Sequence, residues 1–211
     1  PVRTMASRFG IAEVDDAGMV VGYEEKPPHP RTNLASLTIM LFHRDALIRR
    51  IRETARAGAS QLYDHLIPTM VKERRVAAYL FEGYWQYTRT IGAYHGVHMH
   101  LLGQPPQINL SDWNIRTNST VGHVGDYPPA KILHDGVVKD SILSPGCVIE
   151  GTVERSVLSP GVMVARDAVV RDSVLMHGTI VESHASCHLA ICDKHVVVAP
   201  GHHGLLVDHG G

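Results

Sequence analysis

The sequence lacks the features that mark membrane, nucleic-acid-binding and disulfide-rich proteins. No apolar run approaches the roughly 18 to 20 residues that a membrane-spanning helix needs, so no transmembrane segment is predicted. The formal net charge of −1 gives no electrostatic reason to expect a nucleic acid or an anionic membrane as partner. The three cysteines, Cys147, Cys187 and Cys192, are an odd count and too few for a disulfide framework. We therefore expect a reducing, cytoplasmic setting.

The amino-terminal residues carry neither a targeting signal nor an initiator methionine. The opening PVRTMASRFG has no apolar core and no cleavage pattern, so no secretory signal is predicted. We expect a fragment or a processed chain. Its 211 residues are enough to bury a core in one large domain or two small ones.

The first part of the chain alternates strand-like and helix-like patterns, which indicates an α/β layer. Residues 8–25 alternate around the turn DDAG and predict a hairpin. The continuous apolar run at 34–42 predicts a strand buried on both faces, and residues 76–82 predict another strand. Helical spacing of apolar residues predicts helices over 44–57, over 62–72 with a break or kink at Pro68, and over 90–102.

From Gly136 onward the sequence repeats. Three variants of one unit, VKDSILSPGCVI, VERSVLSPGVMV and VRDSVLMHGTIV, begin at Val138, Val153 and Val170, and a worn copy begins at Leu189. The starts are 15, 17 and 19 residues apart, close to 18, the length of a coil with three six-residue sides. Repeats of this length with β-branched residues and Pro-Gly corners predict a β-helix, whose coils must stack to bury their apolar faces.

A segment rich in proline and polar residues separates these two parts. Residues 103–130 include Pro105, Pro106, Pro128 and Pro129 and predict an extended linker. We accordingly expect an α/β domain over 1–104, a linker over 105–134 and the β-helix over 135–211.

Several stretches, in the same order along the chain, resemble ADP-glucose pyrophosphorylase, the glucose-1-phosphate adenylyltransferase of bacterial glycogen synthesis. They are ASRFGI (6–11), GYEEKP (22–27), NLASLTIMLF (33–42), FEGYW (81–85), DWNIRT (112–117), PPAK (128–131) and SVLSPGV (156–162). The resemblance covers nearly the whole chain. It implies the later part of a nucleotidyltransferase domain with a Rossmann-like mixed sheet, followed by a left-handed parallel β-helix of hexapeptide repeats. It also implies an allosteric oligomer, a tetramer in the family, that converts ATP and glucose 1-phosphate to ADP-glucose and pyrophosphate with Mg²⁺.

The resemblance assigns a sugar-phosphate site. GYEEKP matches the family's glucose-1-phosphate motif, in which Lys26 would contact the phosphate as a point charge and Glu25 would accept hydrogen bonds from sugar hydroxyls. Ser36 falls where the family places a serine that hydrogen-bonds the sugar. Taken alone, these residues would be a solvated hairpin end and a small strand residue, and the neighbouring matches favour the site.

Two departures from the family pattern affect the metal and nucleotide sites. The family has G-Y-W-x-D-V-G-T-I, so Tyr87 stands where an aspartate helps hold the metal, and Arg89 replaces a glycine. A phenol is a poor ligand for Mg²⁺, and the stretch from Gly83 to Leu102 offers no acidic substitute. No glycine-rich nucleotide loop precedes Arg3, so we expect the ATP site and several strands in a partner or a longer polypeptide. No working metal site is expected in this chain.

Three interpretations of function follow. Completed by the missing half, the protein would adenylylate glucose 1-phosphate. Alternatively, the chain is a non-catalytic regulatory or assembly subunit that still binds sugar phosphate, which Tyr87 and Arg89 favour. A hexapeptide-repeat acyltransferase with His177 or His184 as general base is a third alternative, against which the first half of the chain argues.

Several of the fifteen histidines carry weaker interpretations. A zinc site is one alternative for His184, Cys187, His188 and Cys192, although a coil would scatter these residues around its axis. Packing or surface roles are favoured for His95, His98 and His100, and exposure for His202, His203 and His209. Trp113 and Arg116 are interpreted as a linker anchor, and an anion-binding regulatory role stays open for Arg116 and Lys131.

Overall fold

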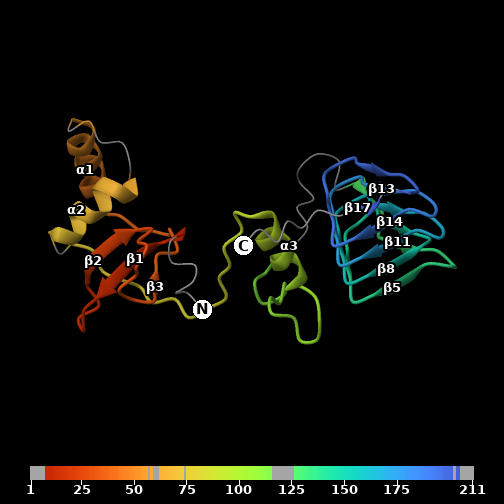
Figure 1. Ribbon diagram of the computed structural model, residues 1–211, viewed down its shortest axis with the longest axis horizontal. Helices are drawn as coiled ribbons and strands as arrows, with labels where there is room; N and C mark the ends of the chain where they lie inside the picture. Colours follow the sequence, from red (N-terminus) through yellow and green to blue (C-terminus); the bar gives the residue numbers. More distant parts are fainter. Residues whose placement is uncertain are drawn as a thin grey trace. The chain divides into compact units, whose positions relative to one another are not determined.

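The computed structural model describes residues 8–56, 58, 62–73, 75–115, 126–201 and 203–204. The chain forms two compact units, residues 1–82 and residues 83–211 (Figure 1). Across the part of the chain that the structure describes, no helix is both long and apolar enough to cross a membrane.

The first unit is built on a three-stranded antiparallel sheet in the order β2-β1-β3. β1 (Gly10–Val14) and β2 (Val20–Glu25) form the predicted hairpin, and β3 (Leu34–Ala35) pairs with the other side of β1. In the turn, the Asp15 carboxylate accepts hydrogen bonds from the N–H groups of Ala17 and Met19. An Asx turn at Asp15 therefore closes the hairpin, at the turn that the DDAG segment predicted.

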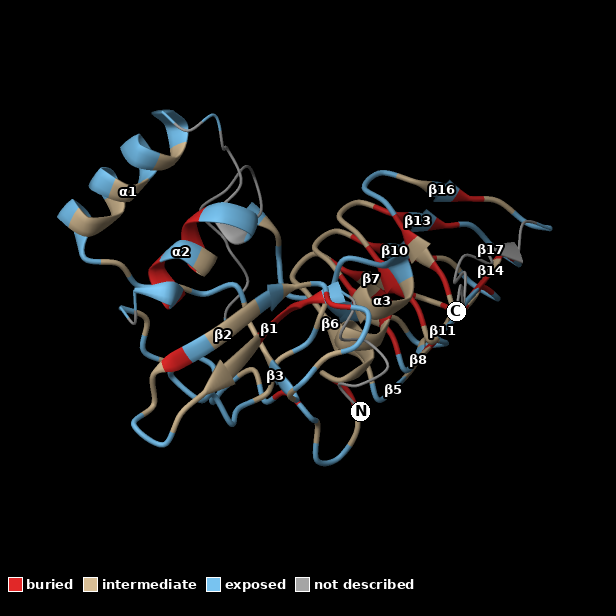
Figure 2. Cartoon of the chain, turned by 60° about the vertical axis from the view of Figure 1, so that its left-hand side comes forward, coloured by how far each residue is buried: buried red, intermediate tan, exposed pale blue. Residues whose placement is uncertain are grey.

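Helix α1 (Arg44–Arg56), the π-helical turn η3 (Leu62–Leu66) and helix α2 (Ile67–Lys72) confirm two of the predicted helices. Pro68 lies in the first turn of α2, where its missing N–H would be unpaired in any helix, so the break falls between η3 and α2. The core of this unit, here called the α2 cluster, consists of Val20, Leu66, Ile67, Met70 and Val71. Helix α1 contributes no buried residue (Figure 2).

Two predicted strands are wrong over most of their length. The run 34–42 is a strand only over β3, and Ile39 is 81% exposed and Leu41 fully exposed. Residues 76–82 contribute only an isolated bridge between Met19 and Ala77, and Tyr79 is 89% exposed. Such apolar runs become buried strands only beside neighbours that cover them. Among the described residues, no strand pairs with 37–42 or 79–82.

The second unit contains a parallel β-solenoid of three sheets, which confirms the predicted β-helix (Figures 1 and 2). The sheet orders are β16-β13-β10-β7-β4, β17-β14-β11-β8-β5 and β15-β12-β9-β6. The strands are β4 (Lys131–Ile132), β5 (Val137–Lys139), β6 (Ile142–Leu143), β7 (Val148–Ile149), β8 (Thr152–Glu154), β9 (Val157–Leu158), β10 (Met163–Val164), β11 (Val169–Arg171), β12 (Val174–Leu175), β13 (Ile180–Val181), β14 (Ser186–His188), β15 (Ile191–Cys192), β16 (Val197–Val198) and β17 (His203–Gly204).

The strand register corrects the alignment of the fourth repeat. Val153 pairs with Val170, and Val170 pairs with Cys187. The fourth copy is therefore in register at Cys187 rather than at Leu189, because a buried free cysteine takes the place of a small apolar side chain inside the coil. Equivalent positions in these later coils lie 17 residues apart, as between Ser173 and Ala190, so the predicted period near 18 is slightly too long.

Buried serines connect successive coils at one corner of the solenoid. Ser156 Oγ accepts a hydrogen bond from the Ser173 N–H at 3.1 Å and donates to the Glu154 carbonyl at 2.8 Å. Ser173 Oγ repeats this one coil later, accepting from the Ala190 N–H at 3.1 Å and donating to the Arg171 carbonyl at 2.6 Å. Each hydroxyl thus satisfies backbone groups that the tight corner removes from water.

Helix α3 (Ile91–Met99) packs on the outside of the solenoid. The Thr90 hydroxyl caps it by accepting a hydrogen bond from the Ala93 N–H at 3.2 Å. His95 is buried, with Nε2 2.6 Å from the Asp172 carbonyl oxygen. Leu175 lies in the interior of the coil, so its neighbour Val174 points outward. Val174 is nevertheless only 2% exposed. We infer that α3 and the residues after it cover this face, consistent with a packing role for His95.

Candidate functional site

Residues from three separate stretches meet in one row across the sheet of the first unit. Gly10 lies opposite Glu25 in the β1–β2 register. On the other side of β1, the Ser36 N–H donates to the Gly10 carbonyl at 2.8 Å, one residue beyond the pair formed by Ile11 and Ala35. Opposed residues of antiparallel strands project from the same face. Glu25, Gly10 and Ser36 therefore form what we call the three-strand row, which brings together the site residues expected from sequence.

Lys26 follows this row directly and has an unusual backbone conformation. Its φ of 49° lies in the left-handed region that non-glycine residues seldom occupy. Its N–H donates to the Phe9 carbonyl at 2.9 Å, which fixes the end of the hairpin. Its side chain is 57% exposed, with Nζ 3.4 Å from Glu25 Oε1. Because so exposed an ion pair stabilises the fold little, Lys26 can exchange the carboxylate for another anion at small cost.

Tyr23 also belongs to this site, although the sequence analysis did not assign it. Its Oη donates to Glu25 Oε2 at 2.8 Å. Gly10 makes room for this contact, because an added Cβ would overlap the Tyr23 hydroxyl. The available signal was the alternation Tyr23-x-Glu25, which places both side chains on one face of a strand.

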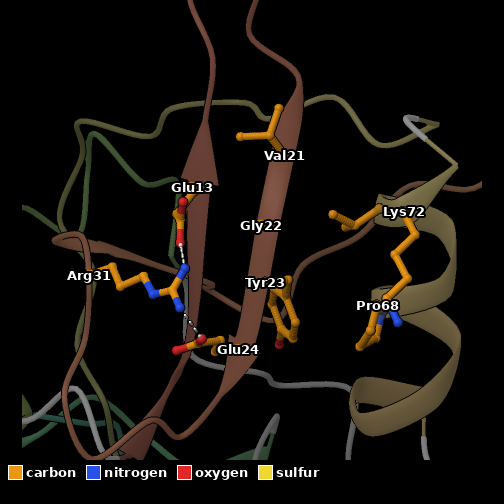
Figure 3. A pocket seen from close by; sticks show the side chains of 9 residues that line it. Glu13, Val21, Gly22, Tyr23, Glu24, Arg31, Pro68 and Lys72 are labelled. Carbon is orange, nitrogen blue, oxygen red and sulfur yellow. Dashed lines mark ion pairs between the residues drawn. The ribbon is translucent and has the colours of Figure 1, made fainter.

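The cavity drawn in Figure 3 is separate from the predicted residues. It has a volume of about 210 Å³ and is lined by Glu13, Val21, Gly22, Tyr23, Glu24, Arg31, Pro68, Val71 and Lys72. Arg31 lies 3.6 Å from Glu13 and 3.8 Å from Glu24, so two carboxylates already offset its charge. Ligand pockets usually exceed about 300 Å³. We therefore do not place the site in this cavity.

The GYW segment, where the family pattern expects a metal-binding aspartate, lies in the second unit. Arg89 Cζ stands 6.0 Å from the centre of the Tyr87 ring, a cation–π distance. A phenol beneath a guanidinium offers no anionic oxygen, so these residues do not fit Mg²⁺. Within the described residues, no group of three or more His, Cys, Asp or Glu side chains is arranged to hold a metal ion.

The same segment contains an aromatic contact cluster. Tyr84 Oη lies 2.6 Å from His100 Nδ1, and the Tyr84 ring meets Trp113 edge-on at 6.0 Å. Desolvation raises the pKa of the Tyr84 phenol, which favours its protonated form. Trp113 thus contacts the GYW segment, and its interpretation as a linker anchor stays a prediction, while Arg116 lies outside the described residues.

The solenoid separates the four zinc-type side chains. Cys187 and Cys192 are buried in the coil, whereas His184 and His188 are exposed. The hydrogen bond between the two thiols raises the pKa of Cys187 and lowers the pKa of Cys192, so the two sulfurs are partners of each other inside the coil, away from the two histidines. His188 Nδ1 instead lies 3.9 Å from Asp172 Oδ2.

The remaining candidates occupy different parts of the second unit. His177 Nε2 lies 3.2 Å from Tyr127 Oη, and its ring meets His195 at 5.3 Å, so it packs in an aromatic column along the Pro-Gly corners. Lys131 is exposed at the start of β4, and His98 Nδ1 lies 2.8 Å from the Tyr94 carbonyl oxygen. His203 lies in β17, whereas His202 and His209 lie outside the described residues.

The fold defines a class of protein: an α/β unit that carries the three-strand row, followed by a parallel β-solenoid. Residues 2–104 match the nucleotidyl transferase family and residues 128–204 match the GlmU-like, C-terminal hexapeptide family. The chain belongs to the nucleotidyl transferases that carry such a solenoid, and the resemblance to ADP-glucose pyrophosphorylase is confirmed at the level of the family.

Curated relatives of the chain include proteins named glucose-1-phosphate adenylyltransferase. The protein from Thermomicrobium roseum is 44% identical over 149 residues, covering 68% of this chain and 33% of the relative. The Bacillus cereus protein is 35% identical over 199 residues, covering 93% of the chain and 52% of the relative. The Shewanella sp. protein is 33% identical over 225 residues, covering 95% and 52%. The chain thus spans a third to a half of the length of the relatives it matches.

Proposed function

We propose that the chain is the sugar-phosphate-binding and solenoid part of a glucose-1-phosphate adenylyltransferase, which joins ATP and glucose 1-phosphate into ADP-glucose and pyrophosphate. The observation that carries the proposal is the three-strand row with Lys26 beside it. The names of the curated relatives support the same substrates. The few cysteines favour a cytoplasmic protein, and the family favours an oligomer built with the solenoid.

The proposed chemistry of this chain is binding and orientation. Lys26 would offset the charge of the phosphate, and Glu25 and Ser36 would form hydrogen bonds with the sugar hydroxyls. Holding the sugar phosphate in a fixed orientation lowers the entropic part of the barrier to attack on the α-phosphorus of ATP. We assign no step to Mg²⁺ in this chain, because Tyr87 and Arg89 do not fit it.

A second candidate function is a non-catalytic subunit that binds the sugar phosphate and contributes the solenoid to an assembly. The Arg89–Tyr87 contact favours it, since a cation stands beside the tyrosine that replaces the metal-binding aspartate of the family pattern. Both candidates require the same sugar-phosphate site, and turnover distinguishes them.

The experiment that tests the shared site measures binding of glucose 1-phosphate by calorimetry to the wild type and to Lys26→Ala. Loss of the phosphate contact should weaken binding about tenfold or more, since a hydrogen bond to a charged group contributes about 1.5–3 kcal/mol. Lys72→Ala is the matched control, because it removes an exposed lysine at the end of α2 in the same unit. Equal affinities of wild type and Lys26→Ala would contradict the proposal.

A further inference from the structure

The hydroxyl group of Tyr23 lies at the centre of the three-strand row. Tyr23 and Glu25 are two residues apart on β2, so both side chains project from the face that carries Gly10. A Cβ on Gly10 would overlap the Tyr23 hydroxyl and come within 2.9 Å of Glu25 Oε2. The phenol therefore occupies the space that glycine leaves between Glu25 and Ser36.

The ring of Tyr23 is held in place by apolar packing. It is partly buried and packs against the α2 cluster together with Ala12 and Val14. Figure 3 shows Tyr23 projecting from β2 near Pro68 of α2. A ring fixed by packing gives its hydroxyl a fixed position, and a hydrogen bond to a carboxylate is stronger than one between neutral groups. Tyr23 thus restricts the rotamers of Glu25 before any ligand binds.

The two carboxylate oxygens of Glu25 have different partners. Oε2 accepts the hydrogen bond from Tyr23, while Oε1 lies 3.4 Å from Lys26 Nζ. A phosphate that binds Lys26 would draw the ammonium away from Oε1. That oxygen would then be free to accept a hydrogen bond from a sugar hydroxyl, while Tyr23 keeps Oε2 in place.

We propose that Tyr23 is a positioning residue: through Oε2 it holds the Glu25 carboxylate so that Oε1 meets a hydroxyl of the sugar phosphate. The inference rests on the proposed function of the three-strand row and deepens it. It assigns the phosphate to Lys26 and the discrimination between a sugar phosphate and a bare phosphate to the Tyr23–Glu25 pair.

The test compares two probes, glucose 1-phosphate and inorganic phosphate, on the full chain. Tyr23→Phe keeps the packed ring and removes only the hydroxyl. It should weaken glucose 1-phosphate binding about tenfold and leave inorganic phosphate binding unchanged, because the Glu25 side chain must then lose rotamer freedom when it meets the sugar hydroxyl. Lys26→Ala should weaken both probes. The melting temperature of Tyr23→Phe should stay well above the temperature of the binding assay, which separates positioning from a loss of fold.

A double-mutant cycle separates positioning from direct contact with the sugar. If Tyr23 acts through Glu25, Tyr23→Phe should have no further effect on glucose 1-phosphate binding in a Glu25→Ala background. A full additional loss in that background would overturn the positioning role. The positioning role would also be overturned if Tyr23→Phe bound both probes as tightly as the wild type does while Lys26→Ala weakened the binding of both. Failure of Lys26→Ala to weaken either probe would instead overturn the proposed function and, with it, this inference.

Discussion

Charged side chains of successive coils alternate in sign on one face of the solenoid. Glu154 lies in register between Lys139 and Arg171, with Oε1 3.2 Å from Lys139 Nζ and Oε2 2.8 Å from Arg171 Nε. At the adjoining corner, Arg155 Nε donates to Asp172 at 2.8 Å. Neighbouring strands of a parallel stack lie about 4.8 Å apart, so identical charges at equivalent positions would repel each other. Alternating the sign of the charge removes this repulsion.

The first residue-scale prediction concerns Glu154. The hydrogen bonds from Lys139 and Arg171 lower the pKa of this carboxyl in the folded chain. A lowered folded-state pKa gives stability that is present above the unfolded pKa and is lost as the pH falls through the folded value. Glu154→Gln should therefore lower the melting temperature at pH 7 by a small amount and have little effect near pH 3, as measured by circular dichroism.

Glu182→Gln is the matched control, because it removes an exposed carboxylate from a later coil of the same solenoid. It should change the melting temperature less than Glu154→Gln at pH 7. A difference between wild type and Glu154→Gln that persisted unchanged at pH 3 would show that the ion pairs are not its cause.

At the scale of elements, the buried serines at the corner of the solenoid predict that removing their hydroxyl groups lowers the free energy of unfolding. Ser173→Ala removes the acceptor of the Ala190 N–H, and Ala190 is only 2% exposed. An unsatisfied buried donor costs about 1–3 kcal/mol, so the free energy of unfolding should fall by about that amount in urea titrations. The exposed Ser183→Ala should change it by less than about 0.5 kcal/mol. Equal effects of the two substitutions would mean that water replaces the hydroxyl.

Elements whose signals are local could be predicted from the sequence, whereas elements that depend on distant partners could not. The turn at Asp15, the helix start at Thr90 and the Pro-Gly corners act within a few residues, and all three are found. The strands expected at 34–42 and 76–82 need neighbours to pair with, which no local pattern supplies. The same limit applied to the site: a family motif located Lys26, whereas the contact of Tyr23 with Glu25 also needs the space that Gly10 leaves on the neighbouring strand, which no local pattern specifies.

At the scale of the whole molecule, sequence family and packing divide the chain differently. The nucleotidyl transferase match ends at residue 104, yet α3, which lies within that match, packs on the solenoid. The segment that carries Tyr84, Tyr87 and Arg89 immediately precedes α3. A substitution in this segment can therefore disturb the packing of α3 on the solenoid as well as any chemistry. Experiments on it should measure both the assembly state and the activity.

The last prediction decides between the catalytic and the non-catalytic interpretation. In the native protein, purified with whatever chains accompany it, Tyr87→Asp combined with Arg89→Gly replaces a phenol and a cation by a carboxylate and an uncharged residue. We expect Mg²⁺-dependent pyrophosphate release from ATP and glucose 1-phosphate to rise, because anionic oxygen is the ligand that Mg²⁺ prefers. Tyr79→Asp, at an exposed tyrosine of the first unit, is the control and should not raise it. Size-exclusion chromatography shows whether assembly is kept. If assembly persists and pyrophosphate release stays at background, the chain is a binding and assembly subunit.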